Sequence, residues 1–246
     1  MIKILVIGEK CVDKFVYCKT NRISPEAPVP VINPINTTSN PGMAGNTVAN
    51  VKALFPDVEV KGIHQTQNIT KTRFVEDKSN HMFVRLDEGD DFDDTFTWDE
   101  NAYASIKESD VVIVSDYDKG FLSDSDLEAI AYRSKLSILD SKRKLTDDII
   151  KDFTFVKLNE SEDNNNKSLN KDNVIVTLGK RGAWYKEVLY HSPNPQDTID
   201  VSGAGDTFTA AFIVKYFELK QEDKAIQFAN EKASEVVSKR GVVVPS

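Results

Sequence analysis

The chain has 246 residues, of which 40% are hydrophobic, enough to bury one substantial core with a small appendage. Its net charge of -8 lacks the basic footprint that nucleic-acid binding requires. Cys11 and Cys18 are too few for a disulfide scaffold or a zinc cage, and they indicate a reducing, cytoplasmic location. Because no segment approaches the roughly 20 apolar residues that span a bilayer, we expect no membrane partner.

Short apolar runs predict the strands of a parallel sheet that is buried on both faces. Helix-like stretches lie between several of these runs. The alternation predicts a three-layer α/β domain with a mostly parallel central sheet, in which ligands bind at the carboxyl ends of the strands. The predicted strands are residues 2–7, 111–115, 136–139, 153–158 and 174–178, and the predicted helices are 47–54, 124–133 and 146–151.

Residues 14–36 and 70–86 differ, because apolar and polar residues alternate there and prolines stand at positions 25, 28, 30 and 34. This pattern predicts a small antiparallel sheet with one face in water. Two polar segments predict solvated loops: 87–100, with eight acids and no base, and 161–173, rich in Asn, Asp and Lys. The first lacks the spacing of a calcium-binding loop.

The segment 200–207 reads Asp-Val-Ser-Gly-Ala-Gly-Asp-Thr and leads into an apolar run, residues 208–217. Small residues let the backbone turn tightly, and the free N–H groups of a following helix form a seat for an anion. Asp206 then stands in the first turn as a lone carboxylate facing that seat. Such an acid is best explained as a base that takes a hydroxyl proton while a phosphoryl group arrives. The alternative is an acid that only complements the helix dipole.

Two common nucleotide-binding motifs are absent. Gly-x4-Gly-Lys-Ser/Thr occurs nowhere, and Gly8 is followed by Glu9, Lys10 and Cys11 in place of a Gly-x-Gly-x-x-Gly pattern. The sequence therefore supports neither a P-loop hydrolase nor a common dinucleotide-binding protein.

The motif at 200–207 resembles the second signature of the ribokinase-like (PfkB) carbohydrate kinases, and further phrases of that family follow in the family's order. Each phrase alone is weak evidence, but their order makes the resemblance specific. Within the family, the chain is most similar to the kinases that phosphorylate heptose 7-phosphate for ADP-heptose synthesis. The phrases are Arg22 to Pro30, Pro41-Gly42 with Ala44 and Asn46, Ile69 to Arg73, Arg85-Leu-Asp87, Ser115-Asp116-Tyr117 with Lys119-Gly120, and Ala229-Asn230 with Val236-Val237.

The resemblance implies one ribokinase-like domain over residues 1–246, in which strands from 14–36 and 70–86 form a lid over the sugar. It implies a carbohydrate kinase that transfers a phosphoryl group from ATP, with Mg²⁺, to the anomeric hydroxyl of heptose 7-phosphate. In the family the lid is commonly the dimer contact. An apolar lid face on a monomer would be an exposed patch, so we expect a homodimer.

By the same resemblance, Asp206 is the catalytic base, and the N–H groups of Gly203, Ala204 and Gly205 form an anion hole for the transferring phosphoryl group. Because Asp206 lies near a helix N-terminus, we expect it to stay ionised and therefore to be a weak base. A loose phosphoryl-transfer transition state tolerates a weak base, because it needs little early proton abstraction.

On the acceptor side, the resemblance assigns sugar hydroxyls to Asp13 and Asn46, and a tight turn to Gly42. A plain surface acid at Asp13 and a helix N-cap at Asn46 are the simpler alternatives. Asp116 follows a predicted strand and is a further candidate. Phosphate groups on the ligands need cations, for which the candidates are Lys119, Lys142 and Arg143 near the strand ends and Arg22, Arg73 and Arg85 in the lid.

The resemblance also implies a nucleotide side. Asn159 and Glu162 match the family's Asn-x-x-Glu element for Mg²⁺ and its waters, although a helix capping box has the same spacing. Asp200 is a candidate ligand for a monovalent cation such as K⁺, or else a structural residue. The candidates for contact with ATP are Asn159, Thr177, Gly179, Gly182 and, near the adenine ring, Asn230.

The chain also departs from the family pattern. Met43 stands where a second glycine is usual beside the sugar, and its bulk would narrow the pocket. Residues 55–69 and 163–173 are short connections, so we expect a trimmed domain. These departures keep two alternatives open: a ribokinase-like kinase for another sugar phosphate, sugar or nucleoside, and a non-catalytic binding protein derived from a kinase.

Overall fold

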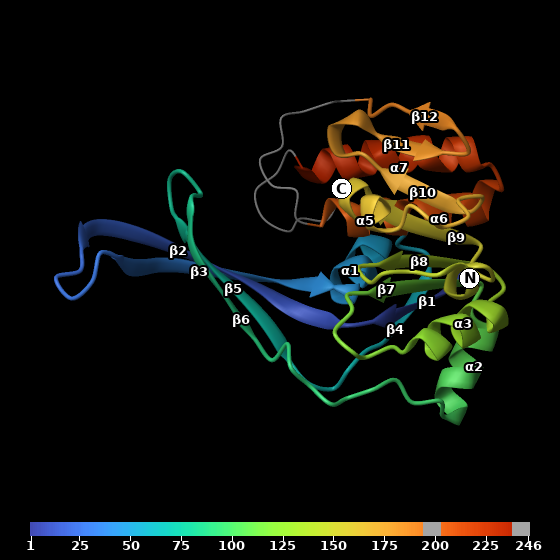
Figure 1. Cartoon of the computed structure of the whole chain (residues 1–246), viewed down its shortest axis with the longest axis horizontal. Helices are drawn as coiled ribbons and strands as arrows, with labels where there is room; N and C mark the ends of the chain where they lie inside the picture. Colours follow the sequence, from blue (N-terminus) through green and yellow to red (C-terminus); the bar gives the residue numbers. More distant parts are fainter. Residues whose placement is uncertain (194–202, 238–246) are drawn as a thin grey trace.

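The computed structural model describes residues 1–193 and 203–237, which form a body around an eight-stranded sheet and an arm built on a four-stranded sheet (Figure 1). The strands of the body are β1 (Lys3–Gly8), β4 (Glu59–Ile63), β7 (Val111–Asp116), β8 (Ser137–Ser141), β9 (Phe155–Asn159), β10 (Val174–Thr177), β11 (Ala183–Tyr185) and β12 (Val188–Tyr190). Their order is β12-β11-β10-β9-β8-β7-β1-β4. Neighbours from β4 to β10 pair in parallel, while β11 and β12 add an antiparallel edge. The predicted mostly parallel sheet is therefore confirmed.

Helices cover both faces of this sheet. They are α1 (Ala44–Leu54), α2 (Glu100–Glu108), α3 (Asp124–Arg133), α4 (Asp147–Ile150), α5 (Glu160–Asn165), α6 (Ala204–Leu219) and α7 (Glu222–Val237), with a short 3₁₀ turn at Gly179–Arg181. Side chains alternate along each strand: in β1, Ile4 and Val6 enter one core with α1, α6 and α7, and Leu5 and Ile7 enter the other with α2, α3 and α4. The result is the expected three-layer α/β body. Among the described helices, none is long and apolar enough to cross a membrane.

The arm consists of β2 (Lys10–Ile23), β3 (Pro30–Met43), β5 (Ile69–Glu76) and β6 (Met82–Glu88), in the order β3-β2-β5-β6. The hairpin of β2 and β3 projects far from the body, and the hairpin of β5 and β6 lies beside it (Figure 1). Each hairpin is antiparallel as predicted, but β2 and β5 run parallel. The four-stranded sheet of the arm, which is the predicted lid, is therefore mixed. The sequence pattern does not distinguish these cases, because parallel and antiparallel strands both have a period of two.

Two connecting segments contain more structure than the sequence suggested. β4 forms within the short segment 55–69 and pairs with β1 at the sheet edge. The acidic segment 87–100, predicted as a solvated loop, is held against the body by Phe96, which is 7% exposed and packs edge-on against Phe121. Asp99 then caps the N-terminus of α2 with its side chain. Buried aromatic side chains outweigh the acidic composition of this segment.

α6 fixes the position of the residues singled out by the sequence. Gly203, its N-cap, has a left-handed φ of 85°, which glycine adopts without strain. Phe208 and Phe212 are buried in the core, and Phe212 packs edge-on against Phe155 of β9. The apolar run therefore anchors the helix against the sheet, with its first turn beside the carboxyl ends of β8 and β9.

Candidate active site

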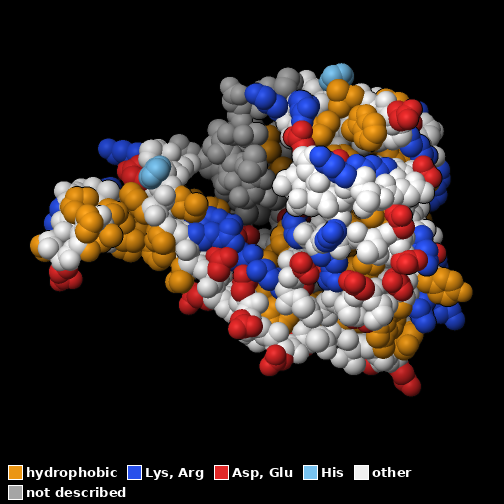
Figure 2. All heavy atoms as spheres, in the orientation of Figure 1, with side chains coloured by type: hydrophobic (Ala, Val, Ile, Leu, Met, Phe, Trp, Pro, Cys, Tyr) orange, Lys and Arg blue, Asp and Glu red, His pale blue; other side chains and the backbone are white. Residues whose placement is uncertain are grey.

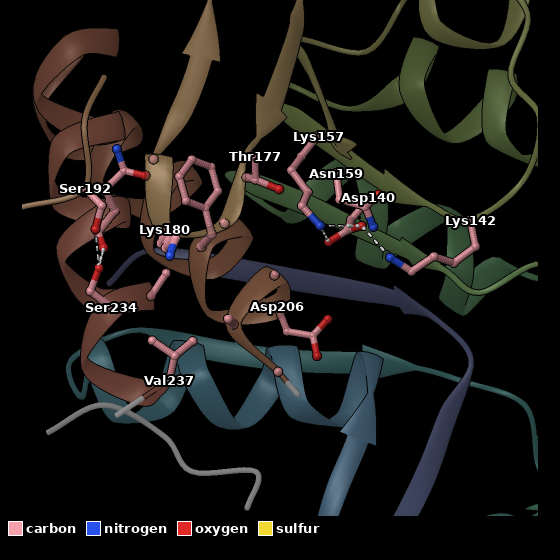
Figure 3. A pocket seen from close by; sticks show the side chains of 18 of the residues that line it. Asp140, Lys142, Lys157, Asn159, Thr177, Lys180, Ser192, Asp206, Ser234 and Val237 are labelled. Atoms are coloured by element: carbon pink, nitrogen blue, oxygen red, sulfur yellow. Dashed lines mark hydrogen bonds and ion pairs between the residues drawn. The ribbon is translucent and has the colours of Figure 1, made fainter. Parts of the chain in front are cut away.

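A pocket of about 360 Å³ opens at the carboxyl ends of β8, β9 and β10, between the first turn of α6 and the last turns of α7 (Figure 3). Its volume is in the range of small-molecule sites. All five nucleotide-side candidates, Asn159, Thr177, Gly179, Gly182 and Asn230, line it. The other lining residues are Tyr117, Asp140, Lys142, Lys157, Lys180, Ser192, Gly203, Ala204, Gly205, Asp206, Phe208, Ala233, Ser234 and Val237.

Two of these candidates, Gly182 and Asn230, also have a structural role beside the pocket. Gly182 has a φ of 101°, and a Cβ there would lie only 2.0 Å from the carbonyl oxygen of Tyr190. Asn230 Nδ2 donates a 2.9 Å hydrogen bond to the same carbonyl oxygen. Both residues therefore hold β12 beside the pocket, in addition to any contact with a ligand.

The first turn of α6 presents the predicted anion seat to the pocket through Gly203, Ala204 and Gly205. A Cβ on Gly205 would lie 2.9 Å from Lys157 Nζ, so glycine leaves room for this ammonium group. The free N–H groups, the positive end of the helix dipole and the ammonium group converge here. This arrangement fits an anion such as a phosphoryl group.

Asp206 is 7% exposed at the edge of this seat. Asn46 Nδ2 donates a 2.8 Å hydrogen bond to its Oδ2, and Tyr117 Oη donates one of 3.1 Å to its Oδ1. Burial, together with the charge of Asp140, raises the pKa of Asp206 to about 6. Asp206 is therefore a stronger base than the expected weak one, because its burial raises the pKa, but it is still mostly ionised at neutral pH. A pKa near neutrality suits a general base.

Asn46 lies inside α1 and is not its N-cap, which is Met43. Asn50 Nδ2 donates a 3.2 Å hydrogen bond to Asn46 Oδ1, and Thr207 Oγ1 donates one of 2.7 Å to Asn50 Oδ1. This chain of buried amides orients Asn46 so that its Nδ2 faces Asp206. Sequence reasoning missed Asn50, although its spacing of one helical turn from Asn46 was a signal.

Sequence reasoning also missed a buried ion pair beneath the anion seat (Figure 3). Lys157 is 2% exposed, and its Nζ lies 3.0 Å from Asp140 Oδ2, which also accepts a 3.0 Å hydrogen bond from Thr209 Oγ1. Burial alone would raise the pKa of Asp140, but Lys157, Lys142 and these hydrogen bonds bring it below its usual value. The signal was a single lysine within an otherwise apolar strand.

On the acceptor side, Gly42 and Asp13 face each other across the hairpin of β2 and β3. A Cβ on Gly42 would lie 2.1 Å from Asp13 Oδ2 and 2.6 Å from Cys11 Sγ, so the position requires glycine. Asp13 is 8% exposed and pairs with Arg73 of β5. Asp13 is therefore not a plain surface acid, and its role toward a sugar stays a prediction.

Met43 has a φ of 55° and a ψ of -136°, a conformation that is strained for a residue with a side chain. Its side chain is 3% exposed and belongs to an apolar cluster with Cys11 and Ile69, against which Tyr117 packs. Met43 thus occupies space between the lid and the ring that reaches Asp206. Its expected effect on the accepted sugar stays a prediction.

Basic side chains from both the arm and the body gather where the two meet, and Figure 2 shows several Lys and Arg side chains in this region. Arg85 binds Asp87 through two hydrogen bonds of 2.7 Å, and Lys119 lies 2.7 Å from Asp90. Lys71 is 8% exposed, and its side chain makes no hydrogen bond or ion pair within the described part of the chain. Sequence reasoning did not single out Lys71, because its burial depends on how the arm lies against the body.

Three predicted residues have other positions or partners than expected. Arg22 is exposed next to the last residue of β2, away from the residues that line the pocket. Asp116 is fully buried at the end of β7, where it accepts hydrogen bonds of 2.7 and 2.9 Å from Arg143 and one of 2.5 Å from Ser141 Oγ. Asp116 and Arg143 form an internal ion pair that holds the loop after β8, so neither is placed to bind a ligand.

Asn159 and Glu162 form the capping box of α5, with reciprocal hydrogen bonds of 2.9 and 2.7 Å. The other carboxylate oxygen of Glu162 pairs with Lys142 Nζ. These contacts account for the spacing of the two residues as a capping box, and their part in holding Mg²⁺ and its waters stays a prediction. The described residues contain no cluster of three or more His, Cys, Asp or Glu side chains that would hold a metal. Asp200 lies outside the described residues.

Solved structures share this architecture over nearly the whole chain. Ribokinase from Arabidopsis thaliana, complexed with ribose and ATP, superposes with a TM-score of 0.72 at 16% identity, covering 98% of this chain and 94% of that one. Ribokinase from Thermotoga maritima gives 0.73 at 17% identity, covering 98% and 95%. The fold is therefore that of the ribokinase-like proteins.

Residues 56–246 match the family described as pfkB family carbohydrate kinase. The chain belongs to this family, as the ordered phrases in its sequence indicated. Among its relatives, the "Bifunctional protein HldE" of a Nitratiruptor species is 29% identical over 97% of this chain, and that of a Campylobacter jejuni strain is 30% identical over 98%. In both cases the match covers 62% of the relative's length.

Proposed function

We propose that this protein transfers the γ-phosphoryl group of ATP to the anomeric hydroxyl of heptose 7-phosphate. The observation that carries the proposal is the place of Asp206. This buried carboxylate, with a pKa of about 6, lies beside the anion seat of α6 and is oriented by Asn46. A base directly beside an anion seat fits in-line transfer of a phosphoryl group to a hydroxyl.

In the proposed reaction, ATP binds in the pocket with its terminal phosphate at the N–H groups of residues 203–205. Lys157 and Lys142 supply positive charge beside that phosphate. Asp206 accepts the proton of the attacking hydroxyl as the new P–O bond forms and the bond to ADP breaks. Mg²⁺, held by the nucleotide's own phosphates and water, would neutralise charge on ATP.

The acceptor would lie between Asp206 and the lid. Asp13 is suited to accept hydrogen bonds from sugar hydroxyls, because each carboxylate oxygen has two lone pairs. Asn46 is suited to orient the reacting end of the sugar. The lid cations Lys71, Arg73 and Arg85 would face the distal phosphate. The preference for a heptose phosphate rests on the sequence phrases and on the HldE relatives.

The test is ADP formation with ATP, Mg²⁺ and heptose 7-phosphate, run beside fructose 6-phosphate, ribose and adenosine. Asp206→Asn should lower turnover by roughly 10²–10⁴-fold while ATP still binds. Asp223→Asn is the matched control, because Asp223 also lies in the first turn of a helix but away from the pocket. Equal activity of wild type and Asp206→Asn would refute the mechanism.

The strained Met43 favours one second candidate, a ribokinase-like kinase with a different acceptor. Its side chain fills space where the family usually has glycine, so a smaller sugar or a nucleoside would be favoured. Turnover on fructose 6-phosphate, ribose or adenosine alone would select this candidate. Binding of ATP without turnover on any acceptor would instead select a non-catalytic protein.

We also propose a homodimer that forms through the lid, because the outer face of the lid sheet exposes hydrophobic side chains. Val12, Val84 and Leu86 lie on that face and are 40, 50 and 47% exposed, and Figure 2 shows hydrophobic side chains along the arm. Light scattering after size exclusion should give a dimer, and Leu86→Glu should give a monomer. Val188→Glu, on β12, is the control. Both cysteines are free and buried, which supports the proposed cytoplasmic location.

A further inference from the structure

Tyr117, which follows β7, stands where the pocket meets the lid. Its side chain lines the pocket, and two ammonium groups lie near its ring, Lys142 Nζ at 5.5 Å and Lys71 Nζ at 6.0 Å from the ring centroid. Its hydroxyl donates a 3.1 Å hydrogen bond to Asp206 Oδ1. The sequence phrase containing Tyr117 gave no reason to assign it a role.

The backbone holds this ring in place. The N–H of Tyr117 donates a 2.8 Å hydrogen bond to Glu9 Oε2, and the N–H of Lys119 donates one of 3.1 Å to Glu9 Oε1. Glu9 is fully buried in the turn after β1. A buried carboxylate that accepts hydrogen bonds from two N–H groups of one loop fixes that loop, so the hydroxyl of Tyr117 reaches Asp206 without having to be ordered first.

We propose that Tyr117 is a positioning residue for phosphoryl transfer, whose hydroxyl holds the Asp206 carboxylate ionised and oriented toward the acceptor. This inference rests on the proposed role of Asp206 as the base. Asn46 donates to Oδ2 and Tyr117 to Oδ1, so the carboxylate is fixed from both sides and each oxygen keeps a lone pair for the acceptor hydroxyl.

The hydroxyl of Tyr117 remains a donor throughout the working pH range. Burial, with the charges of Asp206 and Asp140 beside it, raises the pKa of Tyr117 well above its usual value. A hydrogen bond donated to a carboxylate favours its charged form. Tyr117 thereby opposes the burial of Asp206, which favours the neutral form.

Other groups act on Asp206 as well. Asp140 disfavours its ionisation, while Lys157 and Asn46 favour it. Because these groups stay in place when only the hydroxyl of Tyr117 is removed, the resulting change in the pKa of Asp206 reports on that hydroxyl. The groups facing Asp206 are Asn46 from α1, Cys11 from β2, Tyr117 after β7, Asp140 from β8, Lys142 after β8 and Lys157 from β9.

The test is a pH titration of the full chain labelled with ¹³C at the aspartate carboxyl groups. The resonance of Asp206 is assigned by its loss in Asp206→Asn. Tyr117→Phe keeps the ring and should raise the pKa of Asp206 by roughly one unit. Tyr185→Phe is the matched control, because it removes a buried hydroxyl that contacts Glu222, away from the pocket. An unchanged pKa in Tyr117→Phe would overturn the proposal.

Kinetics give a second readout. In Tyr117→Phe, the acidic limb of the profile of kcat/KM against pH should move to higher pH by the same amount. The loss of kcat/KM relative to wild type should therefore be greater at pH 6 than at pH 8.5. A merely structural role would lower kcat/KM equally at both values, and that result would also overturn the proposal. The titration needs no turnover, so an inactive wild type would refute the proposed function while leaving the role of Tyr117 measurable.

Discussion

Asn46 and Asp206 are 160 residues apart in the sequence, and Asn46 Nδ2 lies 2.8 Å from Asp206 Oδ2. The hydrogen bond joins the helix after the lid to the helix that carries the anion seat. It therefore links the acceptor side of the site to the nucleotide side at the atom proposed to accept the proton.

Asn46→Ala should lower kcat by roughly 10- to 100-fold, because a hydrogen bond to a charged group is lost. The KM for ATP should change little, since Asn46 does not line the nucleotide pocket. Steady-state kinetics with saturating acceptor measure both constants. Asn166→Ala is the control: Asn166 is equally buried but caps backbone groups around α5, so its loss should affect stability and leave kcat unchanged.

The raised pKa of Asp206 predicts a pH dependence of both activity and stability. The base must be ionised, so kcat/KM should fall as the pH drops through about 6. The pKa of Asp206 is about 6 in the folded protein and 3.8 in its ordinary, unfolded setting, so the folded state binds this proton more tightly. The group therefore contributes its full stabilisation below pH 3.8, and this contribution is lost as the pH rises through 6.

Asp206→Asn should therefore be more stable than the wild type by about 3 kcal/mol at pH 8 and by clearly less at pH 5. The amide can accept from Asn46 and donate to Tyr117, so neither partner is left unpaired. Urea denaturation at the two pH values measures the difference. A gain that is equal at both values would show that the pKa of Asp206 is not raised.

The sequence predicted the strands and the glycine-rich turn around the site more fully than the contacts and the pKa of its side chains. Apolar runs such as residues 111–115 identify buried strands, because both faces of a parallel sheet are covered. The glycines before Asp206 identify the anion seat, because that signal is local. The contact with Asn46 and the pKa of Asp206 were not predictable, because they depend on which strands become neighbours and on how deeply the carboxyl is buried.

The pair of Lys157 and Asp140 gives a sharp stability prediction. Lys157→Met should destabilise the protein by about 3–5 kcal/mol, because it leaves Asp140 buried without its cation. The double variant Lys157→Met with Asp140→Asn should recover much of that loss. Urea denaturation measures both. Lys186→Met, which breaks an exposed pair with Glu222, is the control and should cost at most about 1 kcal/mol.

At Met43, we expect substitution by glycine to destabilise the protein less than substitution by alanine, which is the reverse of the usual order. Met43→Ala removes the packed side chain and keeps the strained backbone, so it should cost about 2–5 kcal/mol. Met43→Gly removes the same side chain but relieves the strain at φ 55°, so it should cost less than Met43→Ala. At Met82, which is 49% exposed and does not have a positive φ, glycine should be the worse substitution. The same order at both positions would contradict strain at Met43.

Lys71 predicts which acceptors the site prefers. Two other cations of the lid face, Arg73 and Arg85, pair with Asp13 and Asp87, and Lys119, from the loop after β7 of the body, pairs with Asp90. Lys71 is buried and makes no direct ion pair among the described residues, although its charge, after the hydrogen bonds from Arg85, lowers the pKa of Asp87, its register partner on β6. Because Asp87 is already bound by Arg85, a direct contact with an anionic group of the acceptor would lower the cost of burying this ammonium group.

Lys71→Met should therefore lower kcat/KM for a phosphorylated sugar roughly 10- to 100-fold, since it removes a hydrogen-bonded charge pair with the substrate. The same substitution should have a much smaller effect with the unphosphorylated sugar, and Lys71→Arg should restore part of the difference. Lys14→Met is the matched control, because Lys14 pairs in register with Thr72, the neighbour of Lys71 whose side chain points to the opposite face of the lid. Equal losses for both sugars would mean that Lys71 shapes the lid without binding the phosphate.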